Sequence, residues 1–339
     1  MMSQLSENQK GMIFALVGYS AFTFSDTAVK YIAPYYPPLQ LVCIQTAIAS
    51  LGILLSAKFL GGWTGGRNLR EMKYHAIRAL MNILVCILIF YSFTMLSLAS
   101  IYAMIFTKPF FAAILAVIFY KERVNLPRWL AIVIGFIGVL VILQPGPDSF
   151  RPQLLVPLMA GFFLAIMFLT ARSLKQASPF IICFYPILGT FILALPFAIF
   201  GTPDFHILLT TGEFNMAYSQ PVQPQHIPFF MATALFATTG VLCVSLAFRV
   251  ASAAQVAPFM YIEMVWGLIF GFFIFSDIPD VWMLVGTVVI IASGLYLILL
   301  ERSKRPASAG PLESASAPSA LSATTPPDTS AQQENGVRD

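Results

Sequence analysis

The sequence predicts an all-α integral membrane protein: ten transmembrane helices arranged as two inverted five-helix repeats, with the N and C termini in the cytoplasm. Three observations predict this fold: long apolar blocks, basic residues on alternate connections, and a pattern that recurs at a constant spacing. Of the 339 residues, 58% are hydrophobic and only 10% are charged, whereas a soluble domain carries roughly 25% charged residues. The composition therefore excludes an ordinary soluble domain.

Ten apolar blocks are long enough to cross a bilayer, because a spanning helix needs about 20 mostly apolar residues. Their polarity does not alternate as in the strands of a membrane barrel, so helices are expected. The first block is too long, and is followed too closely by the second, to be a cleaved signal peptide. The expected spans are residues 12–33, 38–60, 75–96, 99–120, 127–144, 153–173, 178–200, 227–249, 253–275 and 280–300.

Lysine and arginine residues gather on alternate connections between these blocks. The side that holds both termini carries most of the 19 basic residues, whereas the opposite side carries only Lys30 and Arg151. By the positive-inside rule, both termini then lie in the cytoplasm, and the basic residues indicate orientation and no nucleic-acid partner. Three segments lie outside the spans: a cytoplasmic start at 1–10, an external loop at 201–226 without Lys or Arg, and a disordered cytoplasmic tail at 303–339.

The two halves of the chain share a pattern. The stretch AMIFTKPFFAAILAVIFYKERV, residues 103–124, corresponds to PFMYIEMVWGLIFGFFIFSDIP, residues 258–279, at an offset of 155 positions. Five spans are an odd number, so the second half, 152–302, is expected upside down relative to the first, 11–145. Inverted repeats are a recurring plan of secondary transporters, which bind substrate near the bilayer midplane where the repeats meet.

In each half, the penultimate span ends in an acid, within YKER or FSDIP, and a glycine-bearing span follows. This arrangement resembles the drug/metabolite transporter superfamily, EamA type, over roughly residues 10–302. The resemblance implies a permease of small organic solutes in the inner (cytoplasmic) membrane. It also implies a central cavity lined by the first, third, fourth, sixth, eighth and ninth helices. The sequence departs from the family pattern at Asp277, where Glu is usual, and at Lys108, where a small residue is common.

Lys108 and Glu263 occupy equivalent positions in the two halves, 155 residues apart. At 1.5 Å per residue each lies roughly 15 Å deep in its span, where a lone charge costs about 2.5–3.5 kcal/mol. Opposite charges that face one wet cavity avoid most of this cost. Three interpretations are open: a structural ion pair between the repeats, a binding site with Lys108 for a carboxylate and Glu263 for an ammonium group, or two residues that never meet.

Other polar and aromatic side chains near these spans are candidates for the cavity wall. Ordinary helix packing is the alternative for each aromatic ring. Two interpretations of Pro109 and Pro258 are open: a kink that frees carbonyls toward the cavity, or ordinary helix packing. The candidate substrate-binding residues, besides Lys108 and Glu263, are Tyr19, Asn82, Gln255, Tyr261 and Trp266.

Asp26 and Lys30 lie four residues apart in the first span, so they share one helix face. We expect them to form a local ion pair or to control access at the external mouth. The four cysteines all fall inside spans and are interpreted as small packing residues. No spacing typical of metal ligands is visible, so neither a metal nor a cofactor is expected.

These features favour a transporter of a zwitterionic metabolite, such as an amino acid or an S-adenosylmethionine-like compound, that works by alternating access. Glu263 is also a candidate carrier of a coupling proton. The first alternative is an exporter of cationic or hydrophobic toxic compounds, and the second is a membrane-embedded lipid-modifying enzyme. The enzyme is disfavoured because no HExxH, GxSxG or P-loop motif occurs. A homodimer stays open, and the sequence leaves substrate identity and direction undetermined.

Overall fold

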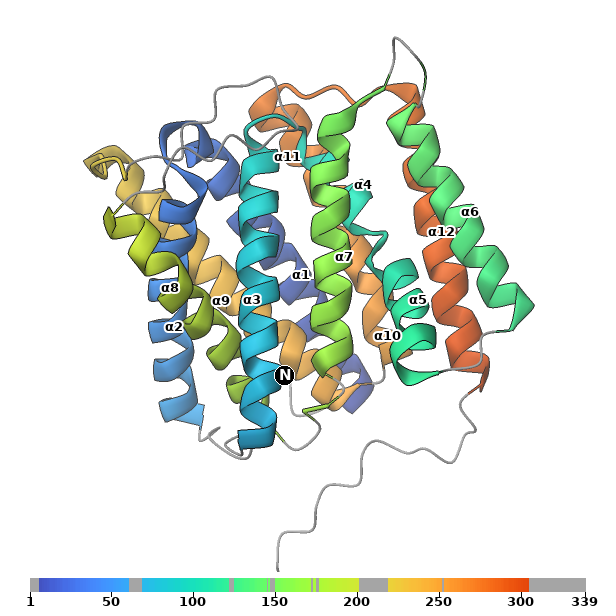
Figure 1. Cartoon of the computed structure of the whole chain (residues 1–339), viewed down its shortest axis with the longest axis horizontal. Coiled ribbons are helices and arrows are strands. Elements are labelled where there is room, and N and C mark those ends of the chain that lie inside the picture. Colours follow the sequence, from blue (N-terminus) through green and yellow to red (C-terminus); the bar gives the residue numbers. More distant parts are fainter. Residues whose placement is uncertain are drawn as a thin grey trace, which may run out of the picture.

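The computed structural model describes residues 6–60, 69–121, 125–144, 146, 150–171, 173–174, 177–200, 219–251 and 253–304. These ranges form a bundle of helices (Figure 1), and no strand occurs within them. The predicted tail, from residue 305 on, lies outside the described residues, as do residues 1–5 and residues 201–218 of the predicted external loop.

The helices cover all ten predicted spans. Nine apolar stretches are long enough to cross a membrane within the described ranges, and Val281–Leu297 is a shorter apolar stretch in the last helix. The prediction of an all-helical membrane protein is confirmed. The helices are α1 (Glu7–Ile32), α2 (Pro38–Leu60), α3 (Leu69–Phe93), α4 (Leu98–Ile105), α5 (Lys108–Tyr120), α6 (Leu126–Leu143), α7 (Leu155–Ala171), α8 (Pro179–Phe200), α9 (Ile227–Val250), α10 (Ala253–Val256), α11 (Ile262–Phe275) and α12 (Val281–Lys304).

The fourth predicted span is broken near its middle. α4 ends at Ile105, and α5 begins at Lys108 with Pro109 in its first turn. A proline has no N–H, so the Ile105 carbonyl loses the donor that a continuous helix would supply four residues later. The Thr107 hydroxyl donates instead to the Met104 carbonyl at 2.6 Å. The kink considered at Pro109 is therefore a full interruption of the helix.

The ninth predicted span is interrupted at the corresponding place. A 3-10 segment, Ala257–Tyr261, follows α10 and contains Pro258, and α11 resumes the α-helix at Ile262. With an offset of 155 residues, Glu263 stands at the start of α11 as Lys108 stands at the start of α5. Both charged residues thus begin a half-helix in the interior of the bundle.

The ends of these two half-helices also correspond. α5 is capped by Lys121 with φ 52°, and α11 by Ser276 with φ 56°, both left-handed conformations that are uncommon outside glycine. The Lys121 N–H donates to the Ala116 carbonyl, and the Ser276 N–H to that of Gly271. All four residues obey the same offset of 155.

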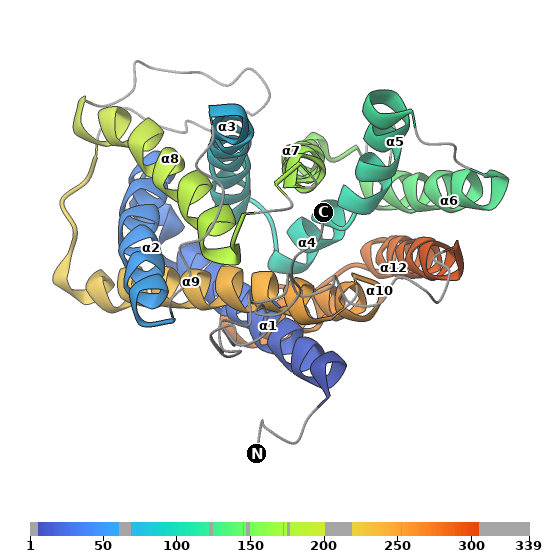
Figure 2. The same cartoon turned by 90° about the horizontal axis from the view of Figure 1, so that it is seen from below.

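Four pairs of helices pack most closely against each other. α1 packs against α9, α3 against α7, α2 against α8, and α6 against α12. In both views α6 and α12 lie together at one end of the molecule and α2 and α8 at the other (Figures 1 and 2). The broken span α4–α5 runs between them and contacts α7 and α11.

Glycines allow the closest approach between α6 and α12. A Cβ atom on Gly138 would lie 2.9 Å from the Gly286 carbonyl oxygen, and one on Gly286 would lie 2.6 Å from the Gly138 carbonyl oxygen. Small residues at such crossings bring backbones together in membranes, where helices gain little from the hydrophobic effect. α6 and α12 therefore form a tightly packed pair at the edge of the bundle.

Candidate functional site

The interior of the bundle contains a buried acid without a direct partner. Glu263 of α11 is only 6% exposed, and within the described part of the chain no group donates a hydrogen bond to its carboxylate. The charge of Glu263 interacts with those of Lys108 and Asp26 at longer range. A buried carboxylate is normally hydrogen-bonded or paired, so Glu263 is an exception among buried acids.

Lys108 does not form the direct ion pair with Glu263 that one interpretation proposes. Its ammonium group lies 6.0 Å from the ring centroid of Phe106 and 5.8 Å from that of Phe168 on α7. These are the outer limits of a cation–π contact. The contact with Phe168 places the Lys108 ammonium group beside α7. The two charges share the interior without contact.

Asp26 of α1 is the second carboxylate of this interior. Its Oδ2 accepts a hydrogen bond of 2.9 Å from the Tyr102 hydroxyl of α4. The Tyr102 ring lies over Gly267 of α11, where a Cβ atom would come within 2.6 Å of it. Tyr102, which no sequence pattern singles out, thus joins α1, α4 and α11.

The predicted local pair between Asp26 and Lys30 is wrong. The Lys30 ammonium donates to Asp277 Oδ2 at 2.7 Å and to the Leu96 carbonyl at 2.9 Å, and it lies 4.6 Å from the Phe275 ring centroid. An i,i+4 pair on one helix contributes only about 0.2–0.5 kcal/mol. Three partners supplied by tertiary packing outweigh it, and Lys30 is 9% exposed as a result.

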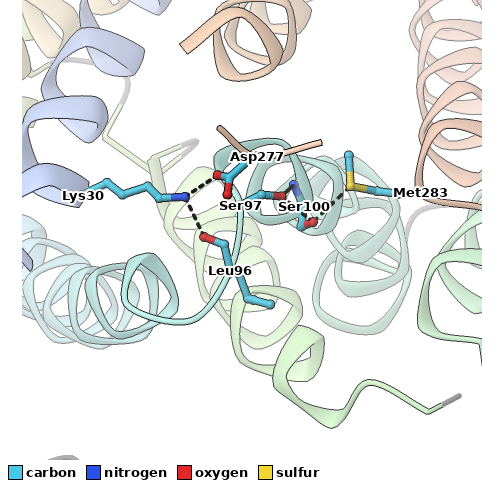
Figure 3. A network of polar contacts seen from close by, with 6 residues as sticks. All are labelled: Lys30, Leu96, Ser97, Ser100, Asp277 and Met283. Atoms are coloured by element: carbon cyan, nitrogen blue, oxygen red, sulfur yellow. Dashed lines mark hydrogen bonds and ion pairs between the residues drawn. The ribbon is translucent and has the colours of Figure 1, made fainter. Parts of the chain in front are cut away.

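We call these four residues, Lys30, Leu96, Phe275 and Asp277, the Lys30 cluster. Figure 3 shows Lys30 between the Asp277 carboxylate and the Leu96 carbonyl. A short polar chain follows: Ser97 and Ser100 share a hydrogen bond of 2.7 Å, and the Ser100 hydroxyl donates to the Met283 sulfur at 3.0 Å. A small pocket lined by Ser97, Gly267, Gly271 and Asp277, among others, adjoins it.

A second ion pair joins the loop before α7 to the start of α12. Arg151 Nη1 lies 2.6 Å from Asp280 Oδ2, and both side chains are at least one-third exposed. Partial burial acts to raise the pKa of Asp280, but the Met283 N–H and the Arg151 guanidinium outweigh it, so the pKa lies below its ordinary value. The pair thus contributes at neutral pH and is lost as the pH falls through that lowered pKa.

Tyr261 belongs to the packing between helices. Its ring meets that of Phe106 edge-on, with centroids 5.1 Å apart, and the two residues are 155 positions apart. The Tyr261 hydroxyl is buried without a hydrogen-bond partner and points at Gly294 of α12, where a Cβ atom would collide with it. This placement favours the packing alternative over a substrate contact.

We expect Gly294→Ala to lower the thermal unfolding temperature of the purified protein, because its methyl group displaces the Tyr261 hydroxyl from a packed core. The cost is about 1–3 kcal/mol, typical of overpacking. Tyr261→Phe removes the colliding atom and loses no hydrogen bond, so Gly294→Ala/Tyr261→Phe should recover most of the loss. A double variant no more stable than Gly294→Ala alone would contradict this placement of Tyr261.

Two further candidates hold helices together. The Trp266 indole N–H donates to the Ser20 hydroxyl of α1 at 2.9 Å, and its ring stacks 5.3 Å from that of Phe270. The Asn82 amide donates to the Thr190 hydroxyl at 2.9 Å, which connects α3 with α8.

The last two candidates are Tyr19 and Gln255. Tyr19 of α1 is 5% exposed, and its hydroxyl interacts electrostatically with Glu263. Gln255 lies half-buried in α10, before the interruption of the ninth span. In the part of the chain that the structure describes, no group of three His, Cys, Asp or Glu side chains is placed to hold a metal ion.

The interior site therefore consists of Asp26, Tyr19, Tyr102, Lys108 and Glu263. Sequence patterns identified Lys108 and Glu263 through their shared offset, and Asp26 only as a neighbour of Lys30. Tyr102 gave no signal, because a single aromatic residue in an apolar span is usually packing. Chemically, the site offers two carboxylates and one amine, with aromatic hydroxyls between them, to a charged solute.

The sequence is similar to those of known transporters. The sequence model of the EamA-like transporter family matches twice, at residues 9–144 and 152–300. An S-adenosylmethionine uptake transporter of Rickettsia conorii is 28% identical over 86% of this chain and 92% of its own. A riboflavin transporter of Vibrio cholerae is 26% identical over 87% of this chain and 95% of its own. One crystal structure superimposes with a TM-score of 0.56 at 13% identity, over 87% of this chain and 98% of the other, which shows a shared fold.

Two halves that match one family, in a bundle of membrane-spanning helices, define a multi-pass transporter of the inner membrane and not an enzyme. The chain belongs to the EamA-like transporter family, within the drug/metabolite transporter superfamily.

Proposed function

We propose that this protein is a secondary transporter that imports a small zwitterionic metabolite, of the amino acid or S-adenosylmethionine type, by alternating access. The observation that carries the proposal is Glu263: a buried carboxylate without a hydrogen-bond donor, on a broken span, within the field of Lys108. A structural acid would be paired. An acid left unpaired in a membrane interior marks a substrate or ion pathway.

The proposed mechanism uses two inverted halves, 11–145 and 152–302, with both termini in the cytoplasm. Its support is the shared offset of 155 residues at the two helix interruptions and at the left-handed caps Lys121 and Ser276. The contact between Phe106 and Tyr261 supports the same arrangement, because these residues occupy equivalent positions in the two halves. Residues related by a twofold axis contact each other only close to that axis. In this orientation the Lys30 cluster lies at the external end of the bundle.

The chemistry of recognition follows from the charges. Lys108 receives the substrate carboxylate, and Glu263 receives its ammonium group through charge-assisted hydrogen bonds. Since the two residues do not contact each other, the substrate does not have to break an existing ion pair to enter. The name of the Rickettsia conorii relative, an uptake transporter, supports import and this class of substrate.

The test is uptake into proteoliposomes that contain the purified full-length protein. We expect saturable, time-dependent accumulation of radiolabelled S-adenosylmethionine, inhibited by unlabelled S-adenosylmethionine and not by an uncharged sugar. An imposed pH gradient that is acidic outside should accelerate uptake if Glu263 carries a coupling proton. If the protein transports a lipophilic cation and neither transports nor binds S-adenosylmethionine, the proposal is overturned in favour of the exporter.

A further inference from the structure

We propose that Asp26 forms a second cation subsite, so that the preferred substrate is an amino acid that bears an additional fixed positive charge. The inference rests on the proposed function and specifies it. An amino acid has one ammonium group, for which Glu263 suffices. The interior holds a second carboxylate, and its surroundings indicate what it receives.

Asp26 has acceptor capacity to spare. Tyr102 donates to Oδ2 at 2.9 Å, and within the described ranges no donor reaches Oδ1. The Asp26 residue is half-buried. The nearest lysine on its own helix, Lys30, is already held by Asp277 at 2.7 Å. Among the described residues, no lysine or arginine forms an ion pair with Asp26.

Titratable groups of three other helices lie near Asp26. Cys86 of α3, Tyr102 of α4 and Glu263 of α11 all interact with its charge. None of these side chains is a cation. With both carboxylates ionised, Asp26, Glu263 and Lys108 leave the interior with one negative charge in excess. In a membrane such an excess is costly, and a substrate with two positive charges and one negative charge removes it.

The two carboxylates belong to different helices, Asp26 to α1 and Glu263 to α11. Tyr102 of α4 is near both, because its hydroxyl donates to Asp26 at 2.9 Å and it interacts electrostatically with Glu263. A substrate that reaches both acids therefore carries its two positive charges on separate groups.

The experiment compares two ligands that differ in one S-methyl group and in the positive charge that this group creates. S-adenosylmethionine and S-adenosylhomocysteine share the ammonium and carboxylate groups, and only the former carries the sulfonium. Binding to the purified full-length protein in nanodiscs is measured by calorimetry. We expect the wild-type protein to bind S-adenosylmethionine at least about tenfold more tightly, from the attraction between one additional pair of charges.

Asp26→Asn should reduce this ratio to near one by weakening S-adenosylmethionine alone. Glu7→Gln, which removes the charge of an exposed acid at the start of α1, should retain it. An unchanged ratio in Asp26→Asn would overturn the inference. Equal binding of the two ligands by the wild-type protein would also overturn it, and this second measurement does not depend on the folding of a variant. Failure of both ligands to bind the wild-type protein would instead overturn the proposed function.

Discussion

Glu263→Gln is expected to lower substrate uptake by about 100-fold or more while the protein still folds and inserts. Loss of one partner of a buried charge pair commonly costs a ligand 2–5 kcal/mol, and 1.4 kcal/mol is tenfold. The side chain keeps its size, and no hydrogen bond within the described part of the chain depends on its charge. Folding therefore loses nothing when the charge is removed, which separates this variant from a merely structural defect.

The measurement is the initial rate of uptake into proteoliposomes, with the amount of inserted protein determined in the same vesicles. Glu7→Gln is the matched control, because Glu7 is an exposed acid at the start of α1 that pairs with Lys10 at 2.7 Å. The same chemical change at that site should leave uptake unaltered. Undiminished uptake by Glu263→Gln would discard the binding role of this residue.

In the Lys30 cluster, Asp277→Asn is expected to destabilise the protein more than Lys30→Met does. Lys30 is 9% exposed and Asp277 is 30% exposed, so loss of the acid leaves a buried ammonium group, whereas loss of the lysine leaves a carboxylate that water can reach. Breaking a buried pair costs about 3–5 kcal/mol. We expect about 3 kcal/mol for Asp277→Asn and about 1 kcal/mol for Lys30→Met.

The unfolding temperature of the purified protein, followed by tryptophan fluorescence, checks this asymmetry. Lys30→Met/Asp277→Leu removes both charges and should be more stable than Asp277→Asn, but with reduced uptake because the ion pair between α1 and the segment after α11 is lost. Arg151→Met is the control, since its ion pair with Asp280 is largely exposed and contributes little. Equal losses in the two single variants would contradict the assignment.

Much of the architecture was predictable from local sequence. The apolar blocks gave the spans because length and composition suffice for a membrane helix. Pro109 and Pro258 indicated where the fourth and ninth spans are interrupted, since a proline removes a helical donor wherever it stands. The offset that relates Lys108 to Glu263 also relates residues that the pattern did not single out, such as the caps Lys121 and Ser276.

The contacts within the site were not predictable in the same way. Asp277, the partner of Lys30, is 247 residues away, and the i,i+4 spacing of Asp26 pointed to a nearer but weaker partner. Tyr261 lies two residues before Glu263, yet side chains two residues apart on a helical turn point in different directions, and the Tyr261 hydroxyl faces α12. Pairing and side-chain direction depend on packing between helices that are distant in the chain.

The two interruptions, at Phe106–Thr107 and before Ile262, have a mechanical consequence. The interruption at Phe106–Thr107 ends one residue before Lys108, and the one before Ile262 ends two residues before Glu263. Under the proposed function, a solute that contacts Lys108 and Glu263 therefore acts on the first turns of two half-helices, α5 and α11. Substrate binding would then tilt these half-helices directly, without a relay through the rest of the bundle.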